Sequence, residues 1–305
     1  MSRVRVVIPA HNEAACIGAA LRSVQEAIAA AEAARPERYE VVVALDRCTD
    51  DTARIALDNQ GVTVVTAPSP GKVEALRAGA AGAVGPWVVI LDADVVLRPD
   101  TLRALAEALD DPTAFAASPP RVPASPRRST PLARAIYHYN LNQGWSPSRP
   151  WLSGRCLATR TLALPDPAEV ARRQAALTPD PWLDGPILAD DIYLSRWVAA
   201  HHGAAALRSS GGAVTFRPPE TLDEVVATWR RLSRELARMD RLYPEWPGPP
   251  RTEARVPWRD RGHAALFGVA LAVAKRRVAQ EAAAARAGGA VAEGWARIAS
   301  SKVPL

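Results

Sequence analysis

The chain has 305 residues, of which 48% are hydrophobic and 23% are charged, a globular composition that excludes a wholly disordered protein. Its three cysteines lack the paired spacing of a zinc site, which favours reduced thiols in a cytoplasmic protein. The formal net charge is +6, and residues 251–277 carry seven Lys or Arg residues but only two acidic ones. This basic segment is either a solvated arginine-rich surface or a face for an anionic partner such as a membrane. We expect no nucleic-acid partner, because no reader motif accompanies it.

Neither a signal peptide nor a membrane-spanning segment is predicted. The first apolar run, residues 6–8, is too short for a signal peptide and is followed at once by Pro9. The longest strongly apolar stretch, residues 264–274, falls short of the roughly 18 residues that span a bilayer. We therefore expect a cytoplasmic protein, with peripheral contact at the inner face of an anionic membrane through residues 251–277 as one alternative.

The first 118 residues alternate short β-branched runs with alanine-rich stretches. Strands are predicted at residues 4–8, 39–45, 62–66, 87–91 and 113–117. Helices are predicted at residues 14–34, 50–58, 72–81 and 100–109. This alternation predicts an α/β fold with a Rossmann-like, mostly parallel sheet and helices on both faces. Ligands of such sheets bind beyond the carboxyl ends of the strands.

After residue 118 proline-rich segments interrupt the alternation. An irregular segment at 119–150 contains a short helix near 132–142, and a mixed region follows. It has predicted helices near 167–176 and 190–202, strands near 204–208 and 213–217, and a long helix at 221–243. A proline-rich linker at 244–257 leads to a last helix at 261–286, which docks on the rest of the chain, pairs with a second subunit or lies on a membrane.

Four acidic clusters follow predicted strands or open a helix, at residues 9–13, 46–52, 92–94 and 190–191. A single such cluster is more simply explained by helix capping or the helix dipole. Asp92 and Asp94 are harder to explain in this way, because two carboxylates after an apolar strand repel each other unless a cation lies between them. Hard oxygen ligands with no His or Cys nearby indicate Mg²⁺ or Mn²⁺, which substrate phosphates help to hold. The sequence therefore predicts a metal-assisted site for a nucleotide diphosphate.

Taken together, the motifs resemble those of family 2 glycosyltransferases with the GT-A fold, over roughly residues 3–235. The resemblance rests on the order and spacing of VIPAHNE at 7–13, DRCTDDT at 46–52, GK at 71–72, LDAD at 91–94, GR at 154–155 and DDIYL at 190–194. It implies a role in cell-envelope or glycan biosynthesis. It also implies a nucleotide-sugar-binding half at 1–118, an acceptor and catalytic half at 119–243, and a linker with a C-terminal helical extension at 244–305.

The resemblance also implies roles for individual residues. The nucleotide base and ribose would be held by Pro9, Ala10, Glu13, Asp46 and Asp92. Asp94 would bind the metal that bridges the diphosphate. Lys72, at the start of a predicted helix, would meet phosphate or base, unless it is a solvated surface lysine.

Catalysis by inversion of the anomeric centre would place Asp191 as the general base, with Asp190 beside it. The acceptor pocket would be shaped by Gly154, Arg155, Trp151 and Trp182, although core packing of the tryptophans and a structural ion pair of Arg155 are equally open.

Three features depart from the family pattern. Asp190 replaces the commoner glutamate, Arg47 and Cys48 stand where small polar residues are usual, and the Q-x-x-R-W element of polymerising members has only a partial counterpart at 228–234. We therefore expect a non-processive transfer of one sugar to an unidentified hydroxyl acceptor, and the resemblance implies a UDP-linked donor. The alternatives are a nucleotidyltransferase of the same fold and an inactive nucleotide-sugar-binding relative.

Overall fold

The computed structural model describes the whole chain except residues 1–2, 143–150, 249–256, 290–301 and 304. Its main sheet has the strand order β3-β2-β1-β4-β8-β6-β9. The strands are β1 (Arg3–Ala10), β2 (Arg38–Leu45), β3 (Val62–Thr66), β4 (Val88–Leu91), β6 (Ala116–Ser118), β8 (Cys156–Thr159) and β9 (Leu207–Ser209). All neighbouring pairs are parallel except those of β8, which runs antiparallel to both β4 and β6. The predicted mostly parallel sheet is confirmed.

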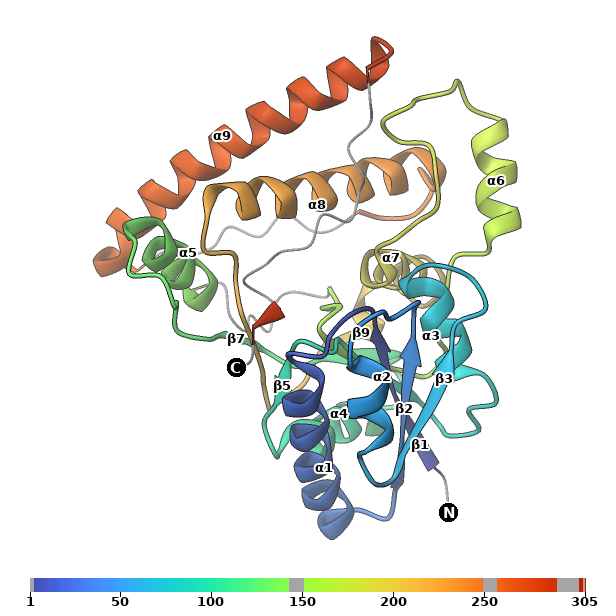
Figure 1. Cartoon of the computed structure of the whole chain (residues 1–305). Coiled ribbons are helices and arrows are strands. Elements are labelled where there is room, and N and C mark those ends of the chain that lie inside the picture. The colour runs from blue at the N-terminus through green and yellow to red at the C-terminus, as the bar shows by residue number, and fades with distance from the viewer. Residues whose placement is uncertain (1–2, 143–150, 249–256, 290–301, 304) are drawn as a thin grey trace.

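Helices cover both faces of this sheet (Figure 1). On one face α1 (Ile17–Ala34), α2 (Thr52–Leu57) and α4 (Thr101–Asp110) pack against one set of alternating β1 and β2 side chains. On the other face α3 (Lys72–Ala80) and α7 (Asp190–His202) share a second cluster with Val7 of β1, Ile90 of β4 and Leu157 of β8. Side chains of a strand alternate between faces, so a strand covered on both sides is apolar throughout: β4 is buried at all four residues, and β1 is buried from Val6 to Ile8.

A second, three-stranded sheet has the order β5-β10-β7, formed by β5 (Val96–Leu97), β7 (Arg121–Pro123) and β10 (Val214–Phe216). The sequence analysis missed β5, β7 and β8. It also placed a strand at 204–208, where the chain forms the 3₁₀ turn η1 (Ala204–Ala206) before β9, and it began the strand at 113–117 too early. These strands are two to four residues long, and their pairing depends on neighbours that are distant in sequence.

The remaining helices are α5 (Pro131–Asn142), α6 (Pro167–Ala175), α8 (Leu222–Leu242) and α9 (Arg261–Arg286), with the 3₁₀ turn η2 (Trp258–Asp260) before α9. A capping box between Thr221 and Glu224 fixes the start of α8. In Figure 1, α8 and α9 lie next to each other, apart from the main sheet. Phe267, Ala274 and Val278 of α9 are buried against α5 and α8, so one face of the last helix docks on the chain itself.

Two expectations for this region are only partly covered by the described residues. The proline-rich linker predicted at 244–257 and the basic segment at 251–277 both include residues 249–256, which lie outside them. Within the part of the chain that the structure describes, no helix is both long and apolar enough to cross a membrane.

Candidate functional site

The loops after β1 and β2 are tied together at the carboxyl edge of the sheet. Asn12 and Arg47 have φ angles of 54° and 47°, a left-handed conformation that non-glycine residues seldom adopt. The Asn12 side-chain oxygen accepts a hydrogen bond of 2.7 Å from the Thr49 amide, and Asp46 accepts one of 3.0 Å from the Gly71 amide. Strained residues that are held in this way are common at ligand sites.

These contacts also account for the unusual residues of the second motif. The Cys48 thiol donates to the carbonyl of Ala10 at 3.3 Å and accepts from the Asn12 amide at 3.4 Å. The Arg47 guanidinium donates to Asp46 at 3.0 Å while most of its side chain stays exposed. Both residues therefore build the loop that contains the predicted base- and ribose-binding positions.

Lys72 connects two of the predicted clusters. Its ammonium lies 2.8 Å from Asp92 Oδ1, after β4, and 2.9 Å from Asp190 Oδ1, at the first residue of α7. Burial opposes the charged form, but the Asp190 and Asp92 carboxylates outweigh it and raise the pKa of Lys72. The alternative of a solvated surface lysine is therefore wrong.

Asp190 is 3% exposed, and its Oδ2 is buried without a hydrogen-bond partner among the described residues. Burial raises the pKa of Asp190 to about 6, and the charge of Lys72 limits that rise.

Asp191 is held against Gly154. The Gly154 amide donates a hydrogen bond of 2.9 Å to Asp191 Oδ2, and the Ile192 amide donates one of 3.0 Å to Asp191 Oδ1. A Cβ at Gly154 would lie 2.9 Å from both Cγ and Oδ2 of Asp191. The adjacent residue, Arg155, accepts a backbone hydrogen bond of 3.0 Å from the Asp92 amide. Pairing of β8 with β4 thus brings the predicted base next to the predicted donor carboxylates.

The loop that leads into α7 is braced from α8. Glu235 Oε2 accepts hydrogen bonds from the amides of Leu188 and Ala189, at 2.8 and 3.1 Å. Arg238 pairs with Glu235 and donates to the carbonyls of Leu183 and other residues of the same loop. Both residues are 2% exposed. This buried pair fixes the position at which Asp190 and Asp191 enter the site, and the sequence analysis did not identify it.

Glu13 and Asp94 face a cation from the distant end of the chain. The Lys302 ammonium forms an ion pair with Glu13 Oε1 and lies 3.4 Å from Asp94 Oδ2. Burial raises the pKa of Glu13 to about 7, with Lys302 acting in the opposite direction. Glu13 Oε2 is buried and has no hydrogen-bond partner among the described residues.

This arrangement fits a hard divalent cation. A cationic group already lies between Asp94 and Glu13, and both supply the oxygen ligands that Mg²⁺ and Mn²⁺ prefer. No cluster of three or more His, Cys, Asp or Glu side chains suited to a metal occurs in the described residues. A metal here would take its remaining ligands from water and substrate phosphates, as is usual for Mg²⁺.

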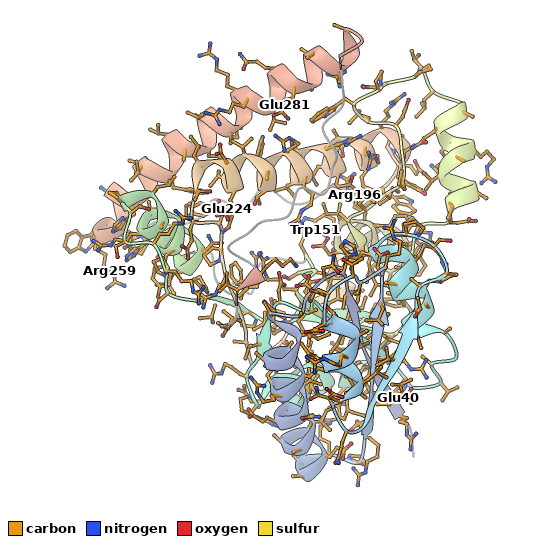
Figure 2. All side chains as sticks on the ribbon, viewed as in Figure 1. Glu40, Trp151, Arg196, Glu224, Arg259 and Glu281 are labelled. Atoms are coloured by element: carbon orange, nitrogen blue, oxygen red, sulfur yellow. The ribbon has the colours of Figure 1, made fainter. Side chains whose placement is uncertain are left out.

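The predicted acceptor residues lie in different surroundings. The guanidinium of Arg155 is stacked 3.8 Å from the centre of the Phe216 ring, and burial lowers its pKa. Trp151, labelled in Figure 2, packs beside the sheet, and the amide of the next residue, Leu152, donates a hydrogen bond of 3.1 Å to Ser195 Oγ of α7. The indole nitrogen of Trp151 lacks a hydrogen-bond partner in the described part of the chain. Trp182 is 4% exposed and belongs to the core between α5, α8 and α9. Trp182 is thus a packing residue in this structure.

The structure thus gathers five predicted residues into one connected network, namely Asp92, Lys72, Asp190, Asp191 and Gly154. It brings Glu13 and Asp94 together as a separate pair around Lys302. The residues that sequence reasoning missed are Lys302, Glu235 and Arg238. No local pattern distinguishes them from ordinary helix or tail residues, although Lys302 is one of only three lysines in the chain.

The profile of glycosyl transferase family 2 matches residues 5–164, just over half of the chain. The chain belongs to this family. Uncharacterised glycosyltransferases of Mycobacterium bovis and Mycobacterium tuberculosis are 36% identical to it over 107 residues, or 35% of this chain and 44% of theirs. The match therefore spans less than half the length of these relatives.

Among solved structures, glucosyl-3-phosphoglycerate synthase from Mycobacterium tuberculosis in complex with phosphoglyceric acid is similar in fold, with a TM-score of 0.50 and 22% identity over 78% of this chain and 80% of that one. A structure of the same synthase with Mn²⁺ and UDP-glucose has a TM-score of 0.50 and 20% identity, covering 84% of this chain and 88% of that one. These likenesses confirm the predicted GT-A-type fold.

Proposed function

We propose that this protein is an inverting, non-processive glycosyltransferase that moves one sugar from a UDP-linked donor to an acceptor hydroxyl. The observation that carries the proposal is the single network in which Lys72 joins Asp92 to Asp190, next to Asp191. This network brings a donor-side carboxylate and a candidate base to the same edge of the sheet. The choice of donor agrees with the UDP-glucose bound by the synthase of similar fold.

In this mechanism the loops after β1 and β2, with Pro9, Ala10 and Asp46, hold the base and ribose. Asp92 contacts the ribose, and Lys72, 2.8 Å from its Oδ1, holds this carboxylate in position. Asp94 would hold Mg²⁺ or Mn²⁺ together with Glu13, which is assigned here to the metal and not to the base and ribose because it shares a cation with Asp94. The metal would offset the negative charge of the departing diphosphate. The synthase of similar fold was crystallised with Mn²⁺.

Asp191 takes the proton of the acceptor hydroxyl as that oxygen attacks the anomeric carbon. Its Oδ2 is oriented by the Gly154 amide, and α7 begins at the adjacent Asp190, so the carboxylate is fixed by backbone rather than by a flexible side chain. Proton transfer by a positioned base typically contributes about 10² to 10⁴ in rate. Arg155, which is half-buried and joined to Asp92 through the backbone, would face an anionic group on an acceptor.

Calorimetry with UDP, with and without Mn²⁺, tests the donor site. We expect Asp94→Asn to lose the Mn²⁺-dependent part of UDP binding. We expect Asp191→Asn to keep UDP affinity and to lose about 10² to 10⁴ in the rate of UDP release from the active UDP-sugar. Loss of UDP binding in Asp191→Asn would contradict its role as base. Intact UDP binding without turnover of any UDP-sugar would instead support an inactive relative, while the family match argues against a nucleotidyltransferase.

We further propose peripheral contact of α9 with an anionic membrane. Leu266, Val269 and Val273 are exposed at helical spacing on the face of α9 that does not pack on α8, and exposed Arg276 follows them. The exposed Trp258 and Arg259 precede the same helix.

Flotation with anionic liposomes tests this contact. Salt-sensitive binding should be lost in Val269→Glu and kept in Val84→Glu, since Val84 is even more exposed than Val269, at 87% against 62%, but lies in a loop before β4. No binding by the unaltered protein would remove this part of the proposal.

A further inference from the structure

Among the described residues of the candidate site, Lys302 comes from the far end of the chain. In Figure 1 the C-terminus lies near β7, on the sheet side of the molecule, while α9 lies at the top. The Lys302 ammonium reaches Glu13, which follows β1, and Asp94, which follows β4. Its side chain is 29% exposed, and the next residue is anchored by a hydrogen bond of 3.1 Å from Arg217 Nε to the Val303 carbonyl.

An ammonium in this place has the same electrostatic function as a metal ion. It offsets the charge of two carboxylates that lie at the carboxyl edge of the sheet, where the leaving diphosphate is expected. It cannot share these oxygens with a divalent cation, because two positive charges within a few ångströms repel each other strongly in a partly buried site. One of the two cations must leave when the other binds.

We propose that Lys302 belongs to the donor site and competes with the divalent metal for Glu13 and Asp94, so that loading of the metal and the nucleotide displaces Lys302 and Val303, which are called the tail below. This inference rests on the proposed function, because it takes Asp94 as the metal ligand. Its consequence is that the tail lowers the apparent affinity for metal and UDP. If the tail leaves the site open in about 10–30% of molecules, the apparent affinity falls about 3- to 10-fold.

A direct contact between Lys302 and the diphosphate would predict the opposite effect on UDP affinity. If its ammonium stayed in place and held the diphosphate itself, removing the charge would weaken UDP binding. The effect of Lys302→Gln on affinity therefore distinguishes a competitor of the metal from a phosphate ligand.

The lysine content makes a direct measurement feasible. The chain has three lysines: Lys72, which is paired with two carboxylates, Lys275, which is exposed on α9, and Lys302. Acylation of the full chain with an amine-reactive ester, followed by mass spectrometry, reports on each of them. Without metal, Lys302 should react several-fold more slowly than Lys275. With Mn²⁺ and UDP, Lys302 should approach the rate of Lys275, whose own rate stays constant.

Calorimetry supplies the second measurement. Lys302→Gln should bind Mn²⁺ and UDP about 3- to 10-fold more tightly than the unaltered chain, while the matched control Lys275→Gln should leave the affinity unchanged. Equal reactivity of Lys302 and Lys275 without metal, an unchanged Lys302 rate on loading, or weaker UDP binding by Lys302→Gln would each overturn the proposal. Failure of both the unaltered chain and the variant to bind Mn²⁺ and UDP would instead refute the donor site itself, and the competition with it.

Discussion

Substitution of Gly154 by alanine tests whether close packing places the proposed base. The φ of Gly154 lies outside the left-handed region, so its backbone accepts an alanine without strain. The added Cβ would nevertheless lie 2.9 Å from Cγ and Oδ2 of Asp191, against an ordinary contact of at least 3.4 Å. The carboxylate must therefore move by about 0.5 Å. Because a misplacement of about 1 Å can cost 10²-fold in rate, we expect kcat to fall about tenfold.

The assay is release of UDP from the active UDP-sugar, read together with calorimetry of UDP and Mn²⁺. Only kcat should change in Gly154→Ala, since the displaced group is the base and not a donor ligand. Gly268→Ala is the control: no atom lies within 4 Å of the added Cβ in α9. This change should leave kcat unchanged and stabilise the helix by about 1 kcal/mol. A kcat within twofold of the unaltered protein, or a parallel loss of UDP affinity, would refute the reasoning.

Three further predictions concern the buried charges. Lys72→Met should lower the free energy of unfolding by about 3 kcal/mol in urea titrations, because it leaves the buried Asp190 carboxylate without its cation; a loss below about 1 kcal/mol would contradict this account. Burial raises the pKa of Glu13 from 4.5 to about 7, so the folded state binds more protons than the unfolded state between these pH values. The free energy of unfolding should therefore fall by about 3 kcal/mol as the pH rises from 4.5 to 7. Glu13→Gln should remove this component, so its stability relative to the unaltered protein should increase from pH 4.5 to pH 8, and a constant difference would argue against it. Glu235→Gln should lower the free energy of unfolding by about 3 kcal/mol, because it leaves Arg238 buried without its carboxylate. It should also speed hydrogen exchange of the amides at 188–189, and unchanged exchange would show that Glu235 does not brace this loop.

At the candidate site, negative charge is concentrated at one edge of the sheet and is compensated only in part. Glu13 Oε2 and Asp190 Oδ2 are both buried without a partner among the described residues. Buried oxygens of this kind are costly to the fold. A bound cation and the polar groups of a substrate would supply the missing partners, so binding of the donor should stabilise the protein.

Much of the fold could be predicted from the sequence because its signals are local. The β-branched runs of β1, β2 and β3 and the helical periodicity of α1 and α4 depend on side chains within one element. The carboxylates after β1, β2 and β4 could be assigned to one edge of the sheet, since parallel strands end on the same side. The division of the chain at residues 118 and 243 stays a prediction.

The tertiary structure alone decided which of these groups meet. Lys72 lies between Asp92 and Asp190 only because α3 and α7 cover the same face of the sheet, and Asp191 reaches Gly154 only because β8 pairs with β4. The arrival of Lys302 at Glu13 has no sequence signal, since 289 residues separate the two. Sequence patterns describe the period and chemistry of single elements, whereas contacts between distant elements are set by packing of the whole chain.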